Sequence, residues 1–178
     1  MDEIDRKLRI QALSERSSAV ENILKHAFLA ELSQIAWEKD PLCSLNISNS
    51  EVDDSGYDVV LEYGGISRHV QIKQAHNEKR PQKYSVRVPF ATLPGSCVVV
   101  IIHSFSNLKV SSYSFYGNKP DEPMPYIEAH KVTKHPGRRD ADGNRKLRLN
   151  YRDALYSRFK KNINPKELFN LLFPLEML

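Results

Sequence analysis

The fold is decided by DDSGYDVVLEYGGISRHVQIKQ, residues 53–74. Two runs of alternating apolar and polar residues, 57–63 and 66–74, flank Gly64 and Gly65, and this pattern predicts two antiparallel strands joined by a tight turn. Side chains alternate between the two faces of a strand, so one face of this hairpin collects polar groups. That face carries Asp58, Val60, Glu62, His69, Gln71 and Lys73, and the opposite face carries Val59, Leu61, Tyr63, Val70 and Ile72.

The composition predicts one soluble domain over residues 1–178, with a core at about 17–117 and a basic C-terminal extension at about 118–178. The longest apolar run, residues 98–102, is far too short to span a bilayer, so we expect no membrane partner. The two cysteines, Cys43 and Cys97, lie far apart in sequence and form no zinc-type cluster. We therefore expect reduced thiols and a cytoplasmic location.

The charge is distributed unevenly along the chain. Residues 1–62 hold 13 acidic and 6 basic residues, whereas residues 63–178 hold 9 acidic and 20 basic residues. Residues 131–161 alone hold 11 Lys or Arg against three Asp. A basic surface of this kind favours a polyanionic partner, although it is also compatible with a solvated surface or an oligomer contact.

The hydrophobic pattern predicts the elements around the hairpin. Apolar residues at helical spacing predict one long helix from Ser17 or Ser18 to about Lys39, and the apolar run at residues 97–103 predicts a central strand covered on both faces. The other expected elements are a short helix or arm at 1–16, strands near 45–47 and at 108–116, a strand or helical turn at 84–94, an exposed loop or hairpin within 126–150, a short helix at 152–159, and a terminal helix at 165–173.

The polar face of the hairpin suggests a metal-dependent hydrolytic site. A hard divalent cation prefers oxygen ligands, which Asp58, the amide oxygen of Gln71, and Glu21 from the long helix can supply. Lys73 shares a strand face with Gln71, and its ammonium group suits the orientation of a water molecule or the stabilisation of a developing anion. Such a site points to hydrolysis of phosphodiester bonds.

Glu21 on an N-terminal helix, followed by Gly-Tyr-Asp at residues 56–58 and Val-Gln-Ile-Lys at residues 70–73, resembles the PD-(D/E)XK nuclease superfamily, and within it the Mrr-like restriction endonucleases. The resemblance covers roughly residues 17–105. It implies an α/β restriction-endonuclease-like core with a mixed central sheet flanked by helices. It also implies that Asp58 and Gln71 bind Mg²⁺ or Mn²⁺, that Lys73 is the catalytic lysine, and that Glu21 is the helix carboxylate.

Two positions depart from the superfamily pattern. Tyr57 replaces the usual proline, and Gln71 replaces a carboxylate. The second change removes one negative charge from the site, so we expect weaker magnesium binding unless Glu21, Asp53 or Asp54 contributes.

The resemblance implies an endonuclease that acts on nucleic acid, with double-stranded DNA as the expected substrate and a homodimer as the expected assembly. The basic segments 79–87 and 131–161 are predicted to follow the phosphates without specifying sequence. The predicted contacts are Lys79, Arg80, Lys83, Arg87, Lys134, Arg138, Arg139, Arg145 and Lys146.

Two other functions remain open from the sequence. The first is a non-catalytic nucleic-acid-binding module on the same fold. The second is an interaction or regulatory protein that uses the basic face for a protein partner. A hairpin with ordinary solvated polar residues would also explain the pattern at 53–74.

Overall fold

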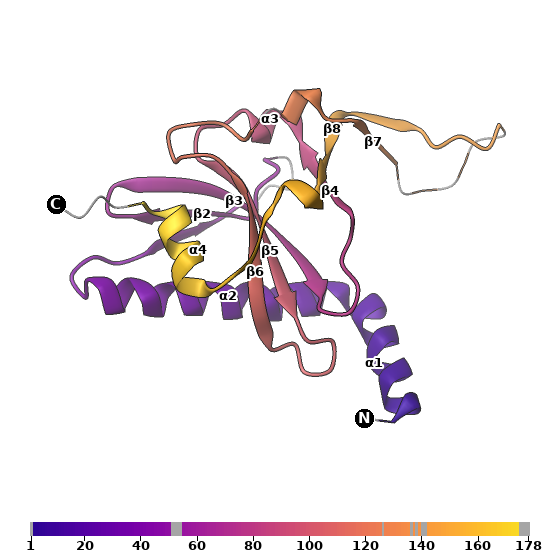
Figure 1. Cartoon of the computed structure of the whole chain (residues 1–178), viewed down its shortest axis with the longest axis horizontal. Coiled ribbons are helices and arrows are strands. Elements are labelled where there is room, and N and C mark those ends of the chain that lie inside the picture. Colours follow the sequence, from indigo (N-terminus) through magenta and orange to yellow (C-terminus); the bar gives the residue numbers. More distant parts are fainter. Residues whose placement is uncertain are drawn as a thin grey trace.

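The computed structural model describes residues 2–50, 55–125, 127–135, 137, 139 and 142–174, and Figure 1 shows the arrangement of its elements. The helices are α1 (Glu3–Glu15), α2 (Ser17–Lys39), α3 (Val88–Ala91) and α4 (Pro165–Leu172), with 3₁₀ turns at Ile127–Ala129 and Tyr156–Arg158. The strands are β1 (Asn46–Asn49), β2 (Val59–Tyr63), β3 (Ile66–His76), β4 (Lys83–Arg87), β5 (Ser96–His103), β6 (Val110–Gly117), β7 (Val132–Lys134), β8 (Leu147–Leu155) and β9 (Lys160–Ile163).

Within the described residues, six strands form the main sheet in the order β1-β2-β3-β5-β6-β9. The pair β3–β5 is parallel, and the other neighbouring pairs are antiparallel. Strands β4, β8 and β7 form a second, smaller sheet. The predicted α/β class is therefore confirmed as a mixed α/β fold whose mostly antiparallel central sheet is flanked by helices.

The predicted hairpin is confirmed as β2 and β3. Gly64 and Gly65 have φ angles of 56° and 79°, which only glycine adopts readily, and they join the strands at the pair Tyr63–Ile66. The apolar face points into the core, where Val59, Leu61 and Val70 are fully buried. This burial fixes the register, because a slip by one residue would turn these side chains to the opposite face.

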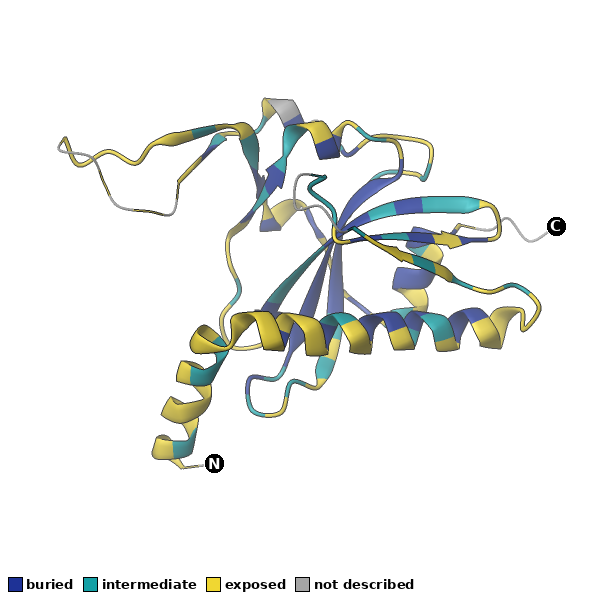
Figure 2. Cartoon of the chain, turned by 180° about the vertical axis from the view of Figure 1, so that it is seen from behind, coloured by how far each residue is buried: buried dark blue, intermediate teal, exposed yellow. Residues whose placement is uncertain are grey.

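The long predicted helix is confirmed as α2. Its buried side chains recur every three or four residues, as Leu24, Phe28, Leu32 and Ile35 show, and they join one core cluster with the apolar face of the hairpin. Exposed residues occupy the other side of the helix (Figure 2). Helix α2 therefore covers one face of the main sheet.

The predicted central strand is confirmed as β5, in which all eight residues are buried. Cys97, Val99 and Ile101 pack in the cluster on the α2 side, whereas Val98 and Val100 pack in a second cluster with α3 and the small sheet. The strand predicted at 108–116 is confirmed as its antiparallel neighbour β6. A continuous apolar run is needed here because both faces of β5 are covered.

The short helix predicted at 152–159 is wrong. Residues up to Leu155 belong to β8, and only Tyr156–Arg158 form a 3₁₀ turn. Pairing with β4, for example Tyr84 with Ala154, decides the conformation of this segment. Residues 84–94 contain both of the structures that the pattern allowed, a strand up to Arg87 followed by the short helix α3.

The C-terminal part of the chain completes the main sheet and its core. Strand β9 pairs with β6, and α4 adds Leu168, Phe169 and Leu172 to the core cluster on the α2 side. Helix α4 begins with a capping box in which Asn164 and Glu167 satisfy each other's backbone N–H groups. The terminal helix predicted at 165–173 is therefore confirmed.

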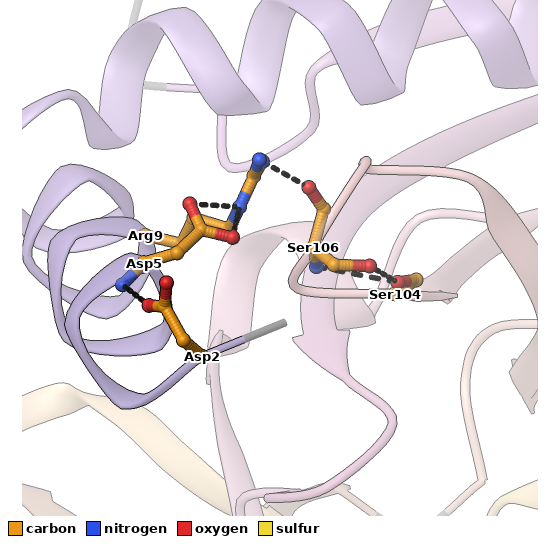
Figure 3. Close-up of polar contacts among 5 residues, drawn as sticks. All are labelled: Asp2, Asp5, Arg9, Ser104 and Ser106. Atoms are coloured by element: carbon orange, nitrogen blue, oxygen red, sulfur yellow. Dashed lines mark hydrogen bonds and ion pairs between the residues drawn. The ribbon is translucent and has the colours of Figure 1, made fainter.

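Helix α1 is held by polar contacts. None of its residues, all of which are described, is buried. Arg6 forms an ion pair with Glu78 at 2.8 Å, and the guanidinium of Arg9 donates to the carbonyl oxygen of Ser106 (Figure 3). Asp2 caps the start of the helix by accepting from the N–H of Asp5 at 2.7 Å.

The two thiols differ in their expected reactivity. Cys97 is fully buried, and burial raises the pKa of its thiol to about 11 against the opposing effect of Arg68, whereas Cys43 is partly exposed. We expect one thiol to react with a colorimetric thiol reagent in the native protein and two to react after unfolding, since the thiolate is the reactive form. Rapid modification of Cys97 in native protein would contradict the buried position of β5.

Candidate functional site

The candidate site lies where the pairing between β2 and β3 ends. The last pair is Val59 with Val70, but β3 continues to His76. Asp58 precedes β2, and its N–H donates to the carbonyl oxygen of Val70 at 2.9 Å. Its Oδ2 accepts from the N–H of Ile72 at 2.6 Å. The carboxylate of Asp58 therefore takes the position that the next backbone carbonyl would occupy if the pairing of β2 with β3 continued.

Close packing positions the segment before Asp58. Gly56 has a φ of +83°, and a Cβ atom there would lie 2.9 Å from the Cβ of Phe90 in α3. The ring of Tyr57 contacts the ring of His69 edge-on, with centroids 5.1 Å apart. The backbone leading to Asp58 is thus held between α3 and the polar face of β3.

A cavity of about 320 Å³ lies between the first half of α2 and this open edge of β3. Glu21, Asp58 and Lys73 line it, so the structure brings three of the four predicted catalytic residues to one cavity. The other lining residues are Asn22, Leu24, Lys25, Ile72, Gln74 and Ile101. Lys73 and Gln74 point to opposite faces of β3 by alternation, but both border the cavity because β2 no longer covers that edge.

Gln71, the fourth predicted residue, does not line this cavity. It is only 9% exposed, and its Oε1 is buried with no hydrogen-bond partner among the described residues. Extending the β2–β3 register by one residue places Gln71 opposite Asp58 on the same face of the sheet. A buried acceptor without a donor costs about 1–3 kcal/mol, so this oxygen is available for a partner that the described residues do not supply.

Sequence reasoning missed Gln74, Lys25 and Asn22. The Oε1 of Gln74 is also buried without a partner among the described residues. Lys25 follows Glu21 by four residues, so helical spacing was a signal that could have found it. Gln74 gave no such signal, because strand alternation assigns it to the face opposite Gln71.

The donor set at this site consists of oxygen atoms. Glu21 and Asp58 supply carboxylates and Gln74 supplies an amide oxygen at the cavity, whereas the amide oxygen of Gln71 lies outside it beside Asp58; such oxygens suit a hard cation such as Mg²⁺ or Mn²⁺. The part of the chain that the structure describes contains no group of three or more His, Cys, Asp or Glu residues that could hold a metal. Asp53 and Asp54 lie outside the described residues.

Several predicted phosphate-binding residues at 79–87 already have partners. Lys83 forms an ion pair with Asp153 at 2.5 Å, and the carboxylate of Asp153 is almost fully buried. The guanidinium of Arg80 donates to the Oδ1 of Asn162 at 3.2 Å. Arg87 ends β4 close to Gly56, and Lys79 is exposed in the turn after β3. The ion pair between Lys83 and Asp153 therefore links β4 to β8.

The remaining predicted phosphate-binding residues lie on an exposed arm. The β7–β8 hairpin extends away from the rest of the molecule in Figures 1 and 2. Lys134, Arg145 and Lys146 are exposed on it, and the guanidinium of Arg139 donates to the carbonyl oxygen of Gly143 at 3.0 Å. Arg138 lies outside the described residues. Leu147 and Leu149 are exposed on the same arm, and Arg148 lies over the ring of Tyr151 at 3.5 Å.

Comparison with known proteins finds no matching family model, no matching curated protein and no matching solved structure. Among the described helices, none has both the length and the apolar composition needed to cross a membrane.

Two glycines allow a matched test of how Asp58 is positioned. Gly56 and Gly65 both have positive φ, but an added Cβ meets Phe90 only at Gly56, since nothing lies within 4 Å of it at Gly65. We expect Gly65→Ala to cost about 1 kcal/mol of unfolding free energy from backbone strain, and Gly56→Ala to cost about 1–3 kcal/mol more from overpacking. Urea unfolding measures both values. Equal losses for the two variants would contradict the contact between Gly56 and α3.

Proposed function

We propose that this chain is a divalent-metal-dependent endonuclease that hydrolyses DNA phosphodiester bonds on a PD-(D/E)XK-like core. The order of the elements supports the proposal. Helix α2 is followed by the site-bearing hairpin β2–β3 and then by β5, which lies parallel to β3 in a mixed sheet. Glu21 from the helix and Asp58 and Lys73 from the hairpin meet at one cavity.

The unpartnered Oε1 of Gln71 is the observation that carries the proposal. It lies on the face shared with Asp58, whose carboxylate has a second oxygen, Oδ1, besides the Oδ2 that accepts from the N–H of Ile72. A hard cation would satisfy both oxygens, and Glu21 would add a second negative charge. A neutral amide in place of a third carboxylate reduces the affinity for the cation without removing a ligand oxygen.

The side chains of the chain itself have defined roles in this proposal. A bound Mg²⁺ or Mn²⁺ would lower the pKa of a coordinated water and offset charge on the phosphate. Asp58 and Glu21 hold ligand oxygens toward the cavity and orient the attacking water. The ammonium of Lys73 stabilises the negative charge that develops on the phosphate as the water oxygen bonds to phosphorus and the bond to the leaving oxygen breaks.

The basic arm supports DNA as the substrate. Lys134, Arg145 and Lys146 are exposed on a projecting hairpin, where they can contact phosphates of a bound duplex. Each such contact makes binding more sensitive to salt, and none of them specifies a base. Lys83 is not part of this proposed surface, because Asp153 neutralises it.

A plasmid cleavage assay tests the catalytic assignment. With Mg²⁺ or Mn²⁺ we expect the wild-type protein to convert supercoiled plasmid to open or linear forms, and we expect Lys73→Ala and Asp58→Ala each to lower the rate by at least about 100-fold, since they remove charge stabilisation and a ligand. Lys119→Ala is the matched control, because Lys119 is an exposed lysine after β6 that does not line the cavity. Cleavage that survives both site substitutions would refute the assignment.

Gln71 allows a test of cation binding that does not depend on activity. Without metal, we expect Gln71→Leu to raise the unfolding free energy by about 1–3 kcal/mol, because it removes a buried acceptor that has no donor. We also expect Gln71→Leu to abolish the stabilisation by saturating Mg²⁺ and Gln71→Glu to increase it, since a ligand that binds the native state stabilises it. Urea unfolding with and without Mg²⁺ measures these effects.

Gln74→Leu is the comparison variant, because Gln74 also has a buried, unpartnered Oε1. Stabilisation by Mg²⁺ that is retained in Gln71→Leu and lost in Gln74→Leu would contradict the assignment of Gln71 as the ligand.

The exposed arm also favours a second candidate, a nucleic-acid-binding module without catalysis. Retention of DNA that falls steeply with salt, together with no cleavage in either metal, would favour this module. Failure to bind DNA even at low salt would instead favour a protein partner for the basic surface.

A further inference from the structure

The outer side of α2, turned away from the main sheet, carries a row of residues that the described part of the structure leaves exposed or half-buried. We call it the outer stripe, and it consists of Ala19, Ile23, His26, Ala27, Ala30, Ser33, Gln34 and Trp37. Trp37 is 69% exposed and Ile23 is 53% exposed. Contiguous exposed apolar patches rimmed by polar residues mark interaction surfaces, and the small apolar residues between Ile23 and Trp37 connect them along one face.

The outer stripe has the spacing of a helix-pairing seam. Ala19, Ile23, His26, Ala30, Ser33 and Trp37 follow one another at alternating intervals of four and three residues, which is the repeat of a and d positions. The stripe contains no Asp, Glu, Lys or Arg, although 27% of the chain is charged. Its small central residues allow a second helix to approach closely.

The pattern is complementary to itself when the helix is reversed. An antiparallel copy centred on Ala30 places Ile23 against Trp37 of the other copy, since both lie seven residues from Ala30. The same rotation brings His26 beside Ser33, which can form a hydrogen bond across the pair. A groove of about 400 Å³ beside Trp37, lined by Ser33, Gln34, Trp37 and Glu38, can receive the isoleucine.

Area favours a second copy as the occupant, and the seam itself carries no charge that would repel one. Two chains of net charge +4 can approach without like-charge contacts at this uncharged seam. A fully covered aromatic side chain buries about 150–250 Å², so the exposed part of Trp37 supplies roughly 100–170 Å². Two stripes of about five turns then bury about 1,000 Å² in total, which is the low end for a specific interface.

We propose that the outer stripe is the interface of a two-fold symmetric homodimer in which the α2 helices pack antiparallel about Ala30. Glu21 lies nine residues before Ala30, about two and a half turns away, and therefore faces the opposite side of the helix. The cavity at Asp58 and Lys73 stays open in this dimer. The proposal does not depend on the nuclease assignment.

Trp37 reports on the interface directly because it is the only tryptophan of the chain. We expect sedimentation to show a monomer–dimer equilibrium, with Trp37 emission shifting to shorter wavelength as the protein concentration rises. Trp37→Glu is expected to raise the dissociation constant at least about 100-fold, as for an aromatic side chain that becomes buried in an interface. The matched control is Leu149→Glu, since Leu149 is 71% exposed on the arm and should leave the dimer unchanged.

A cysteine at the two-fold axis tests the orientation of the helices. In a Cys43→Ser background, Ala30→Cys should form an intermolecular disulfide under mild oxidation, because the two copies of residue 30 meet. Ala19→Cys should not, because antiparallel packing separates its two copies by about 33 Å along the helix axes. A protein that stays monomeric at every concentration, or one that crosslinks equally at both positions, would overturn the proposal.

Discussion

The offset between the two partners of β3 is the constraint on which the candidate site depends. Its first residues pair with β2, and its later residues pair with the fully buried strand β5. The strand is therefore fixed on one side at the point where its other edge becomes open. At the start of that open edge, the carboxylate of Asp58 accepts from the N–H of Ile72, and the cavity beneath α2 lies next to it. A longer β2 would cover the cavity, and a shorter β3 would remove Lys73 from it.

The sequence predicts those parts of the fold whose pattern of apolar residues is compatible with only one type of secondary structure. Two glycines between alternating runs specify the hairpin, the helical repeat of Leu24, Phe28 and Leu32 specifies α2, and the uninterrupted apolar run of β5 specifies a strand covered on both faces. The prediction of a helix at residues 152–159 failed because a run of only eight residues is compatible with both the helical period and the strand period. Pairing of Tyr84 with Ala154, a contact between distant segments, decides between them.

The residues of the candidate site were predictable to the extent that they follow strand alternation. Asp58 and Lys73 line one cavity as the hairpin pattern suggested, together with Glu21, which was predicted from the long helix. Strand alternation could not identify Gln74, because side chains from both faces of β3 border the cavity where β2 no longer covers its edge. Counting charges could not show that Lys83 is held by the buried carboxylate of Asp153, because that ion pair joins two strands of the small sheet. Composition thus overstated the number of cations free to meet a polyanion.

Helix α1 contributes no buried side chain, and it contacts the core through partly buried side chains such as Leu13. Exposed ion pairs such as that between Arg6 and Glu78 contribute about 0–1 kcal/mol each, and no buried side chain of α1 adds to them. Opening of this helix therefore needs little free energy and leaves the buried residues of both hydrophobic clusters in place, so its amide hydrogens should exchange long before those of α2 or β5. Higher ionic strength therefore has two effects on this protein: salt screens the charges of the basic arm, and it also weakens the ion pairs that hold α1.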